Sequence, residues 1–327
     1  MADHADDGDG DDIFVYRGGR APRHITHVLI DESVDEIDDY AFWNCKQLLQ
    51  VDTHDGIRKV GIKAFQECKS LRRINLKSAV EIEEYAFYKC GNLVDVEFGD
   101  RLETIRRYAF GHCTSLQHLK LPSIITIVSY AFHNCKSLVD IEFSERLETL
   151  GVRTFSSCRR LQRIAIPAKR DLFYEDDESV WERFGSQYVD CEQLTTVDLV
   201  GGIHKTVASL HMKSWRTEML AEIHRINQVL PNTPTFRKTD AVEQWMESFI
   251  DKMDHYKAEH YRYVKEGITL LELALWKAKL LGEKDEYEAE TKPKKAKVES
   301  GSARKEKRVT CGADIVIKNV LPCLQLE

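Results

Sequence analysis

The feature that most constrains this sequence is a motif that returns every 22 or 23 residues. Five segments share the order Ala-Phe-x-x-Cys, and a sixth, TFSSC, replaces the alanine with Thr154. A fixed period in this range is typical of a solenoid in which each repeat forms one coil. Because a single coil cannot bury its own apolar side chains, stacked coils must share one continuous core. The cysteines of the six segments are Cys45, Cys68, Cys90, Cys113, Cys135 and Cys158.

Two further parts of the motif keep the same register. A leucine follows each cysteine by three residues and opens a short alternating run such as LRRINL or LVDIEF. Alternate residues of a strand point to opposite faces, so each run predicts a strand with an apolar side turned inward. An aliphatic residue such as Ile82 or Ile105 also stands four positions before each alanine. The sequence therefore predicts stacked coils that each contribute a short strand.

The neighbours His112 and Cys113 could be interpreted as a catalytic pair or as a metal site. Cysteine recurs at the position of Cys113 in all six segments, whereas the position of His112 holds Asn, Glu, Lys or Ser elsewhere. A catalytic pair would be singular, and a buried cysteine packs as a small hydrophobic residue. We therefore expect a structural core role for the six cysteines and a surface position for His112.

The complete motif resembles the BspA-type leucine-rich repeat family, whose repeat runs roughly Ile-x-x-x-Ala-Phe-x-x-Cys-x-x-Leu-x-x-Ile-x-Ile-Pro. The resemblance covers about residues 24–208. The proline that ends the motif is kept only at Pro122 and Pro167, and the interval from Cys158 to Cys191 is 33 residues. The resemblance implies a binding scaffold without enzymatic activity.

Acidic segments precede and interrupt the predicted solenoid. Residues 1–23 begin with six aspartates in twelve positions, so we expect a largely disordered N-terminus. An insertion at residues 169–186 combines a run of four acidic residues with several aromatic ones. The aromatic residues could anchor an interface or fold back onto the solenoid as an elaborated coil, and we favour the second interpretation.

Each predicted strand leaves two side chains on its outward side. If Ile74 points inward, then Arg73 and Asn75 point outward, and the same holds in every coil. Solenoids use such extended surfaces for recognition, which predicts a charged strip that binds a partner protein. The opposing interpretation is that charges of alternating sign neutralise one another, at about 0–1 kcal/mol for each exposed pair. The candidate partner-binding residues are Arg73, Asp95, Glu97, His118, Lys120, Asp140, Glu142 and Arg163.

Beyond the solenoid the apolar residues are spaced three and four apart, as on one face of a helix. Residues 209–282 predict an antiparallel helical hairpin, interrupted at Pro231 and Pro234 because proline cannot continue a helix. The hairpin either caps the last coil or exposes a face to a second copy or another helix. The predicted fold class is an α/β repeat protein: a leucine-rich repeat solenoid of about eight 22–23-residue coils, followed by a C-terminal α-helical hairpin and tail.

The C-terminal end divides into a charged and an apolar segment. Residues 283–308 predict a disordered, charged linker because they contain almost no core-forming side chains. A short basic block in this linker is either a nuclear import signal or plain solvated chain. Residues 309–327 are apolar again and predict a short segment that docks on the hairpin or on a partner. The basic block contains Lys292, Lys294, Lys295 and Lys297.

Composition and motifs limit the classes of function. The net charge of −7 gives no reason to expect a nucleic-acid partner, and no window approaches the roughly 20 apolar residues of a membrane span. The acidic start lacks the features of a secretory signal, which predicts an intracellular protein, cytoplasmic and, if the import signal works, nuclear. His255, Glu259 and His260 lack the His-Glu-x-x-His zinc spacing, and we expect no metal, cofactor or catalytic residue.

Two functions fit these observations. The first is a non-enzymatic protein–protein interaction scaffold or adaptor that uses the leucine-rich repeat face, the helical hairpin or both. The alternative is a structural protein that self-associates through residues 209–282 and presents the solenoid.

Overall fold

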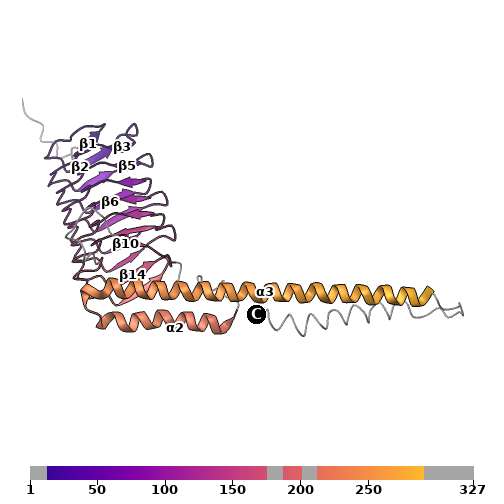
Figure 1. Ribbon diagram of the computed structural model, residues 1–327. Helices are drawn as coiled ribbons and strands as arrows, with labels where there is room; N and C mark the ends of the chain where they lie inside the picture. The colour runs from indigo at the N-terminus through magenta and orange to yellow at the C-terminus, as the bar shows by residue number, and fades with distance from the viewer. Residues whose placement is uncertain (1–12, 175–186, 201–211, 291–327) are drawn as a thin grey trace, which may run out of the picture. The chain divides into compact units, whose positions relative to one another are not determined.

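The computed structural model describes residues 13–174, 187–200 and 212–290 (Figure 1). The chain divides into two compact units. The first comprises residues 1–206 and 220–250, and the second comprises residues 207–219 and 251–327. The first unit contains the solenoid and the second contains most of the longest helix.

One side of the solenoid is formed by the strands that follow each Cys-x-x-Leu segment, which we call the front sheet. Its neighbouring strands pair in parallel, and inward residues such as Ile74 and Val96 are buried. Among the described residues the front sheet falls into three hydrogen-bonded groups, with breaks between β4 and β6 and between β8 and β10. The strands are β1 (Ile13–Tyr16), β2 (His27–Ile30), β4 (Gln50–Asp52), β6 (Arg73–Leu76), β8 (Asp95–Phe98), β10 (His118–Lys120), β12 (Asp140–Glu142), β14 (Arg163–Ile166) and β16 (Thr196–Leu199).

A second parallel sheet, the back sheet, is built on the aliphatic residues that precede each Ala-Phe pair. Ile37, Val60 and Ile82 follow one another in register and are buried. Phe173 continues this sheet beyond the sixth repeat, so the start of the insertion returns to the solenoid. The strands are β3 (Glu36–Ile37), β5 (Lys59–Val60), β7 (Glu81–Ile82), β9 (Thr104–Ile105), β11 (Thr126–Ile127), β13 (Thr149–Gly151) and β15 (Phe173–Tyr174).

A column of stacked phenylalanine rings fills the space between the two sheets. Neighbouring rings lie 4.9–5.8 Å apart, centroid to centroid, and are nearly parallel. Tyr16 extends the column at one end and Tyr188 at the other. The rings and the cysteines that follow them are 0 % exposed, so each repeat contributes to one continuous core. The rings belong to Phe42, Phe65, Phe87, Phe110, Phe132 and Phe155.

Each of the six repeats also contains two residues with left-handed backbone conformation, with φ between 53° and 64°, and Asp190 before Cys191 shares this conformation. One precedes the Ala-Phe pair, or Thr154 in the sixth repeat, and the other precedes the cysteine. A residue with φ in this range allows a tight turn that an extended or helical residue cannot make. The first set is Tyr40, Lys63, Tyr85, Tyr108, Tyr130 and Arg153, and the second is Asn44, Glu67, Lys89, His112, Asn134, Ser157 and Asp190.

The structure confirms the predicted class, a leucine-rich repeat solenoid followed by helices, and corrects two boundaries. Six coils carry the full frame, and β1, β2 and β16 extend the stack at its ends. The expectation of a largely disordered segment at residues 1–23 does not hold for Ile13–Tyr16, because β1 pairs with β2 over four residues. The alternation of Phe14 and Tyr16 buries one side of β1 against the first coil, and the Tyr16 hydroxyl donates to the Gly19 carbonyl at 3.1 Å.

Helices α2 (Lys213–Val229) and α3 (Lys238–Glu290) follow the solenoid, with short 3-10 turns η1 (Leu230–Asn232) and η2 (Thr235–Arg237) between them. The interruption between the two helices falls at Pro231 and Pro234, as predicted. The predicted linker begins too early, because α3 continues through residue 290, where Glu, Lys and Ala favour a helix. The Trp245 indole N–H donates to the Glu222 carbonyl at 3.1 Å, and Trp215 stacks on Tyr256 at 5.0 Å. The later residues of α2 thus meet the earlier residues of α3, which makes the pair antiparallel.

The helical part of the first unit closes the end of the solenoid. Lys238 is 1 % exposed, and its ammonium group donates to the carbonyls of Cys191, Glu192 and Leu194 at 3.1, 3.3 and 2.6 Å. The Asn227 side-chain oxygen accepts from the Val197 N–H of β16 at 2.8 Å. The start of α3 therefore caps the last coil, which is the first of the two roles expected for the hairpin.

Candidate functional site

All eight candidate partner-binding residues lie on the front sheet at outward positions. Those on β6, β8 and β10 are exposed, and those on β12 and β14 are partly buried. Parallel register brings them into two rows, in which Arg73 lies beside Asp95 and Lys120 beside Glu142. The two ends of these rows differ in their electrostatics.

At the C-terminal end the charges pair with one another. The Arg163 guanidinium lies 2.8 Å from an Asp140 carboxylate oxygen and 3.1 Å from one of Asp198. One guanidinium thus bridges three neighbouring strands and neutralises two carboxylates. This part of the rows fits the interpretation of self-neutralising charges.

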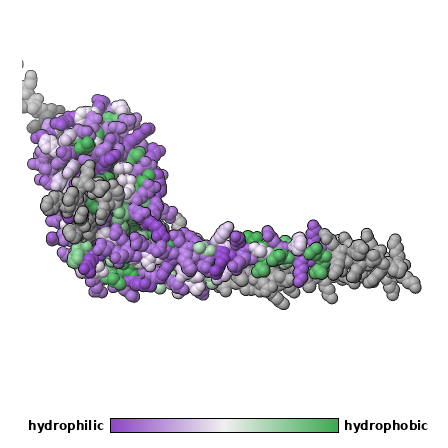
Figure 2. Space-filling view, viewed as in Figure 1, coloured by the Kyte–Doolittle hydropathy of each residue, from purple (hydrophilic) through white to green (hydrophobic). Residues whose placement is uncertain are grey.

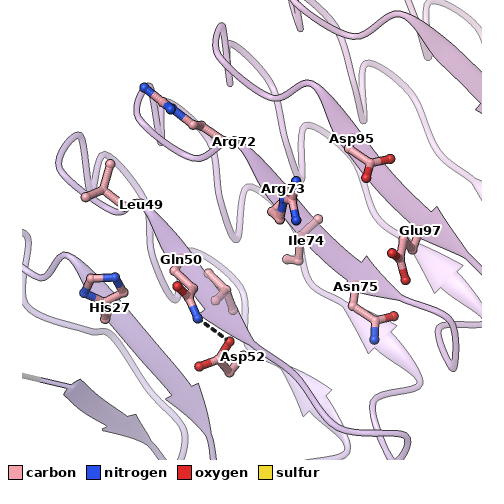
Figure 3. Close-up of a pocket in the computed structure, with 11 residues that line it drawn as sticks. His27, Leu49, Gln50, Asp52, Arg72, Arg73, Ile74, Asn75, Asp95 and Glu97 are labelled. Atoms are coloured by element: carbon pink, nitrogen blue, oxygen red, sulfur yellow. Dashed lines mark hydrogen bonds between the residues drawn. The ribbon is translucent and has the colours of Figure 1, made fainter.

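At the N-terminal end the front sheet contains a pocket of about 580 Å³ (Figure 3). It lies across the break between β4 and β6, where the Thr53 hydroxyl donates to the Asn75 carbonyl at 2.7 Å. The Gln50 amide donates to Asp52 at 2.8 Å. The lining residues are His27, Leu49, Gln50, Val51, Asp52, Arg72, Arg73, Ile74, Asn75, Asp95 and Glu97.

The pocket carries both signs of charge. Glu97 forms an ion pair with Lys77 at 2.7 Å, and the hydrogen bond from Lys77 holds the pKa of the Glu97 carboxyl below its usual value. Within the described ranges, Arg73 and Asp95 form no salt bridge, although they are neighbours across the sheet. The Arg73 charge also contributes to the lowered pKa of Glu97, so it interacts with the pocket through electrostatics rather than through an ion pair.

The first outward residues of the front sheet are aliphatic rather than charged. Ile13, Val15 and Leu29 are 57 %, 38 % and 44 % exposed. Val15 lies beside Leu29, which lies beside Asp52 at the pocket. Sequence reasoning missed Ile13 and Val15 because it placed residues 1–23 in a largely disordered segment. It assigned His27 and Leu29 to the solenoid but did not include them among the candidate partner-binding residues. The β-branched and aromatic residues of the IFVY segment favour a strand, and this pattern could have predicted β1.

His112 and Cys113 do not form a catalytic site. The Cys113 thiol donates to the Phe87 carbonyl at 3.1 Å, and its burial raises its pKa well above the usual value. The His112 ring nitrogen Nδ1 lies 2.8 Å from the Asn134 amide nitrogen. His112 is half-buried rather than fully on the surface, and this burial together with Lys89 lowers its pKa.

The other cysteines of the column repeat the contact of Cys113. The thiols of Cys68, Cys90, Cys135, Cys158 and Cys191 each donate to the phenylalanine carbonyl of the preceding repeat at 3.0–3.2 Å. Cys45, at the first coil, faces the Pro22 carbonyl at 3.5 Å. A thiol held this way in the core is neither exposed nor ionised, so it lacks the properties of a nucleophile.

Other predicted features lie partly or wholly beyond the described residues. No group of three His, Cys, Asp or Glu side chains in the described part of the chain could hold a metal ion. Among the same residues, no helix combines the length and apolar character needed to cross a membrane. The acidic run at 175–178, the basic block Lys292, Lys294, Lys295 and Lys297, and the segment 309–327 fall outside the described residues. The import signal and the intracellular location stay predictions.

Comparison with known proteins identifies the repeats. Six copies of the BspA-type leucine-rich repeat region match the chain, over residues 21–124 and 80–176. The repeat region belongs to the BspA-type leucine-rich repeat family. Leucine-rich repeat solenoids of this kind are typically non-enzymatic scaffolds.

Solved structures of bacterial leucine-rich repeat proteins are similar to this chain. A leucine-rich repeat protein of T. pallidum is 25 % identical with a TM-score of 0.46, and the match covers 62 % of this chain and 88 % of that one. One from Bacteroides ovatus is 23 % identical with a TM-score of 0.37, and the match covers 54 % of this chain and 56 % of that one. No curated protein matches the chain.

Proposed function

We propose that the protein is a non-enzymatic scaffold that binds another protein through the N-terminal part of its front sheet. The observation that carries this proposal is the apolar patch of Ile13, Val15 and Leu29 beside a pocket of mixed charge. Interfaces typically combine an apolar centre with a polar rim. The patch would supply the centre and the pocket the rim.

The chemistry of this surface favours a protein over other partners. Arg72 and Arg73 can bind carboxylates of a partner, and Asp52 and Asp95 can bind basic side chains. A nucleic acid would meet repulsion from the acidic residues, because its affinity depends on an excess of basic contacts. Exposed aliphatic residues that adjoin one another are typical of protein interaction sites.

The proposed surface is narrower than the strip predicted from sequence. Arg163 and Asp140 are engaged with each other, so breaking their pair to bind a partner would cost free energy. Among the described residues Arg73 forms no ion pair that a partner would have to break. We therefore assign recognition to β1, β2, β4, β6 and β8, with His118 and Lys120 at the margin of the site.

The test is affinity capture with the full-length chain, followed by measurement of the dissociation constant for the captured protein. Leu29→Lys, at the centre of the proposed interface, should weaken binding at least about tenfold. Arg73→Glu, at its rim, should weaken binding to a similar extent, because the reversed charge would repel the carboxylates that Arg73 would bind. Matched controls are Val229→Lys, which changes an exposed aliphatic residue of α2, and Arg159→Glu, which reverses an exposed arginine next to Cys158, outside the proposed surface. Binding that is unchanged by the first two variants, or weakened equally by all four, would reject this surface.

A further inference from the structure

The second unit exposes an unusual number of large apolar side chains on α3. Figure 2 shows such residues gathered on the distal part of this helix. Apolar residues occur there on most sides of the helix, and a helix of this kind is stable when it packs against a partner. Those that are 47–70 % exposed are Tyr261, Ile268, Leu270, Leu273, Leu275, Trp276, Leu280 and Leu281.

The spacing of the apolar residues selects one continuous seam. Two helices that pack along their lengths meet at positions alternately three and four residues apart, the a and d positions of a heptad. Of the seven registers available over residues 260–281, one contains no charged residue, no polar side chain other than a tyrosine hydroxyl, and no glycine. The a positions of this seam are Tyr261, Ile268 and Leu275, and its d positions are Val264, Leu271 and Ala278.

The side-chain sizes along the seam match a second copy that runs in the opposite direction. In an antiparallel pair, a positions of one helix face d positions of the other. Tyr261 then faces Ala278 of the second copy, and Ile268 faces Leu271 of the second copy. The outer layers thus pair the largest side chain of the seam with the smallest, and the inner layers pair aliphatic side chains of similar size. A parallel pair would instead place Tyr261 against Tyr261 of the second copy and Ala278 against Ala278 of the second copy.

The charges beside the seam support the same direction. Lys265 and Glu272 occupy e positions, which face e positions of the other helix when the pair is antiparallel. Centred between residues 269 and 270, such a pair places Lys265 opposite Glu272 of the second copy twice, by symmetry. An in-register parallel pair would instead place Lys265 near His260 and Glu272 near Gly267, with no ion pair gained.

We propose that a second copy of this chain binds the seam from Tyr261 to Ala278 and forms an antiparallel two-helix coiled coil. The dimer is isologous, because the same surface contributes from both copies. The seam covers eighteen residues, or about 27 Å of helix. This length is short for a coiled coil, so we expect association that depends on protein concentration in the micromolar range.

Sedimentation equilibrium of the full-length chain under reducing conditions tests the proposal. The wild type should convert from monomer to dimer as concentration rises. Leu275→Lys, within the seam, should raise the dissociation constant at least about 30-fold. The control Leu273→Lys changes the same residue type, at similar exposure, on another side of α3 and should leave the constant within about threefold. The proposal is overturned if the wild type stays monomeric at all concentrations, as it would if its own tail or a different protein covered the seam. It is also overturned if Leu275→Lys and Leu273→Lys weaken dimerisation equally.

A charge exchange tests the direction of the helices. Lys265→Glu and Glu272→Lys should each weaken the dimer about tenfold, because each creates two like-charge contacts. The double variant Lys265→Glu/Glu272→Lys should dimerise like the wild type, and mixing the two single variants should give a heterodimer. Failure of both the double variant and the mixture to recover dimerisation excludes the antiparallel seam. Partner capture by the front sheet is a separate readout, so this result leaves the proposed function untouched.

Discussion

Raising the pH should unfold the solenoid through its buried cysteines. Burial raises the pKa of these thiols above the usual value. In the unfolded chain a cysteine ionises with a pKa of about 8.5. Above that pH the unfolded state binds fewer protons than the folded state, so the free energy of unfolding falls as pH rises. The five thiols whose pKa is raised furthest belong to Cys68, Cys90, Cys113, Cys158 and Cys191.

The repeat multiplies a small effect. Well above pH 8.5 each thiol lowers the free energy of unfolding by about 1.4 kcal/mol per pH unit. At pH 10 this amounts to about 2 kcal/mol for one cysteine and about 10 kcal/mol for five. Native domains are typically stable by about 5–15 kcal/mol. For a stability of about 5–10 kcal/mol, we therefore expect the folded state to be lost between about pH 9 and pH 10.

Urea denaturation followed by far-UV circular dichroism, at intervals from pH 7.5 to 9.5 and with a reductant, measures this dependence. Below pH 8 the free energy of unfolding should be nearly constant, and above pH 8.5 it should fall with increasing slope. Cys113→Ala removes one ionising group and should reduce that slope by about 1.4 kcal/mol per pH unit, whatever it does to stability at neutral pH. A free energy of unfolding that stays level up to pH 9.5 would refute the account of buried, neutral thiols.

Three further predictions concern stability at neutral pH and are measured by the same denaturation. Phe87→Ala should cost about 3–5 kcal/mol, because the ring stacks between Phe65 and Phe110 at 5.1 and 5.0 Å; Phe87→Leu should cost clearly less, and equal effects would contradict the stacking argument. Lys238→Met should cost about 2–4 kcal/mol, since it leaves three carbonyls of the last coil without their donor; the exposed Lys213→Met is its control. Gly61→Ala should cost about 1–3 kcal/mol, because the added methyl would lie 2.6 Å from the Ile37 carbonyl oxygen; an unchanged midpoint would show that the turn relaxes freely.

The core was predictable from the sequence because the same residue types recur at each core position in six repeats. Phe87 and Cys90 were placed in core columns by their recurrence, and the structure buries both. The two-residue strands of the back sheet were not predicted as strands, since a pair such as Glu81–Ile82 is too short to show an alternating pattern. Strand β1 was missed because the acidic composition of the first twelve residues was extended to its neighbours.

The candidate site was only partly predictable from sequence. Outward positions followed from the strand period, which located Arg73 and Arg163 equally well. Side-chain geometry then separates them, because Arg163 reaches two carboxylates and Arg73 reaches none among the described residues. The pocket itself depends on the break between β4 and β6, which has no counterpart in the residue pattern. Capping by Lys238 was also invisible, since its acceptors are backbone carbonyls 44–47 residues earlier.

The left-handed residues of each turn have a consequence for how this protein tolerates change over generations. The positions before each cysteine hold Asn, Glu, Lys, His, Ser and Asp, so they look free to vary. None of the left-handed positions before the cysteines or the Ala-Phe pairs holds Val, Ile or Thr, whose branched side chains fit this backbone poorly. Drift at these sites is therefore confined by main-chain geometry rather than by burial or binding. A sequence comparison that scored only the type of side chain would mistake them for unconstrained surface.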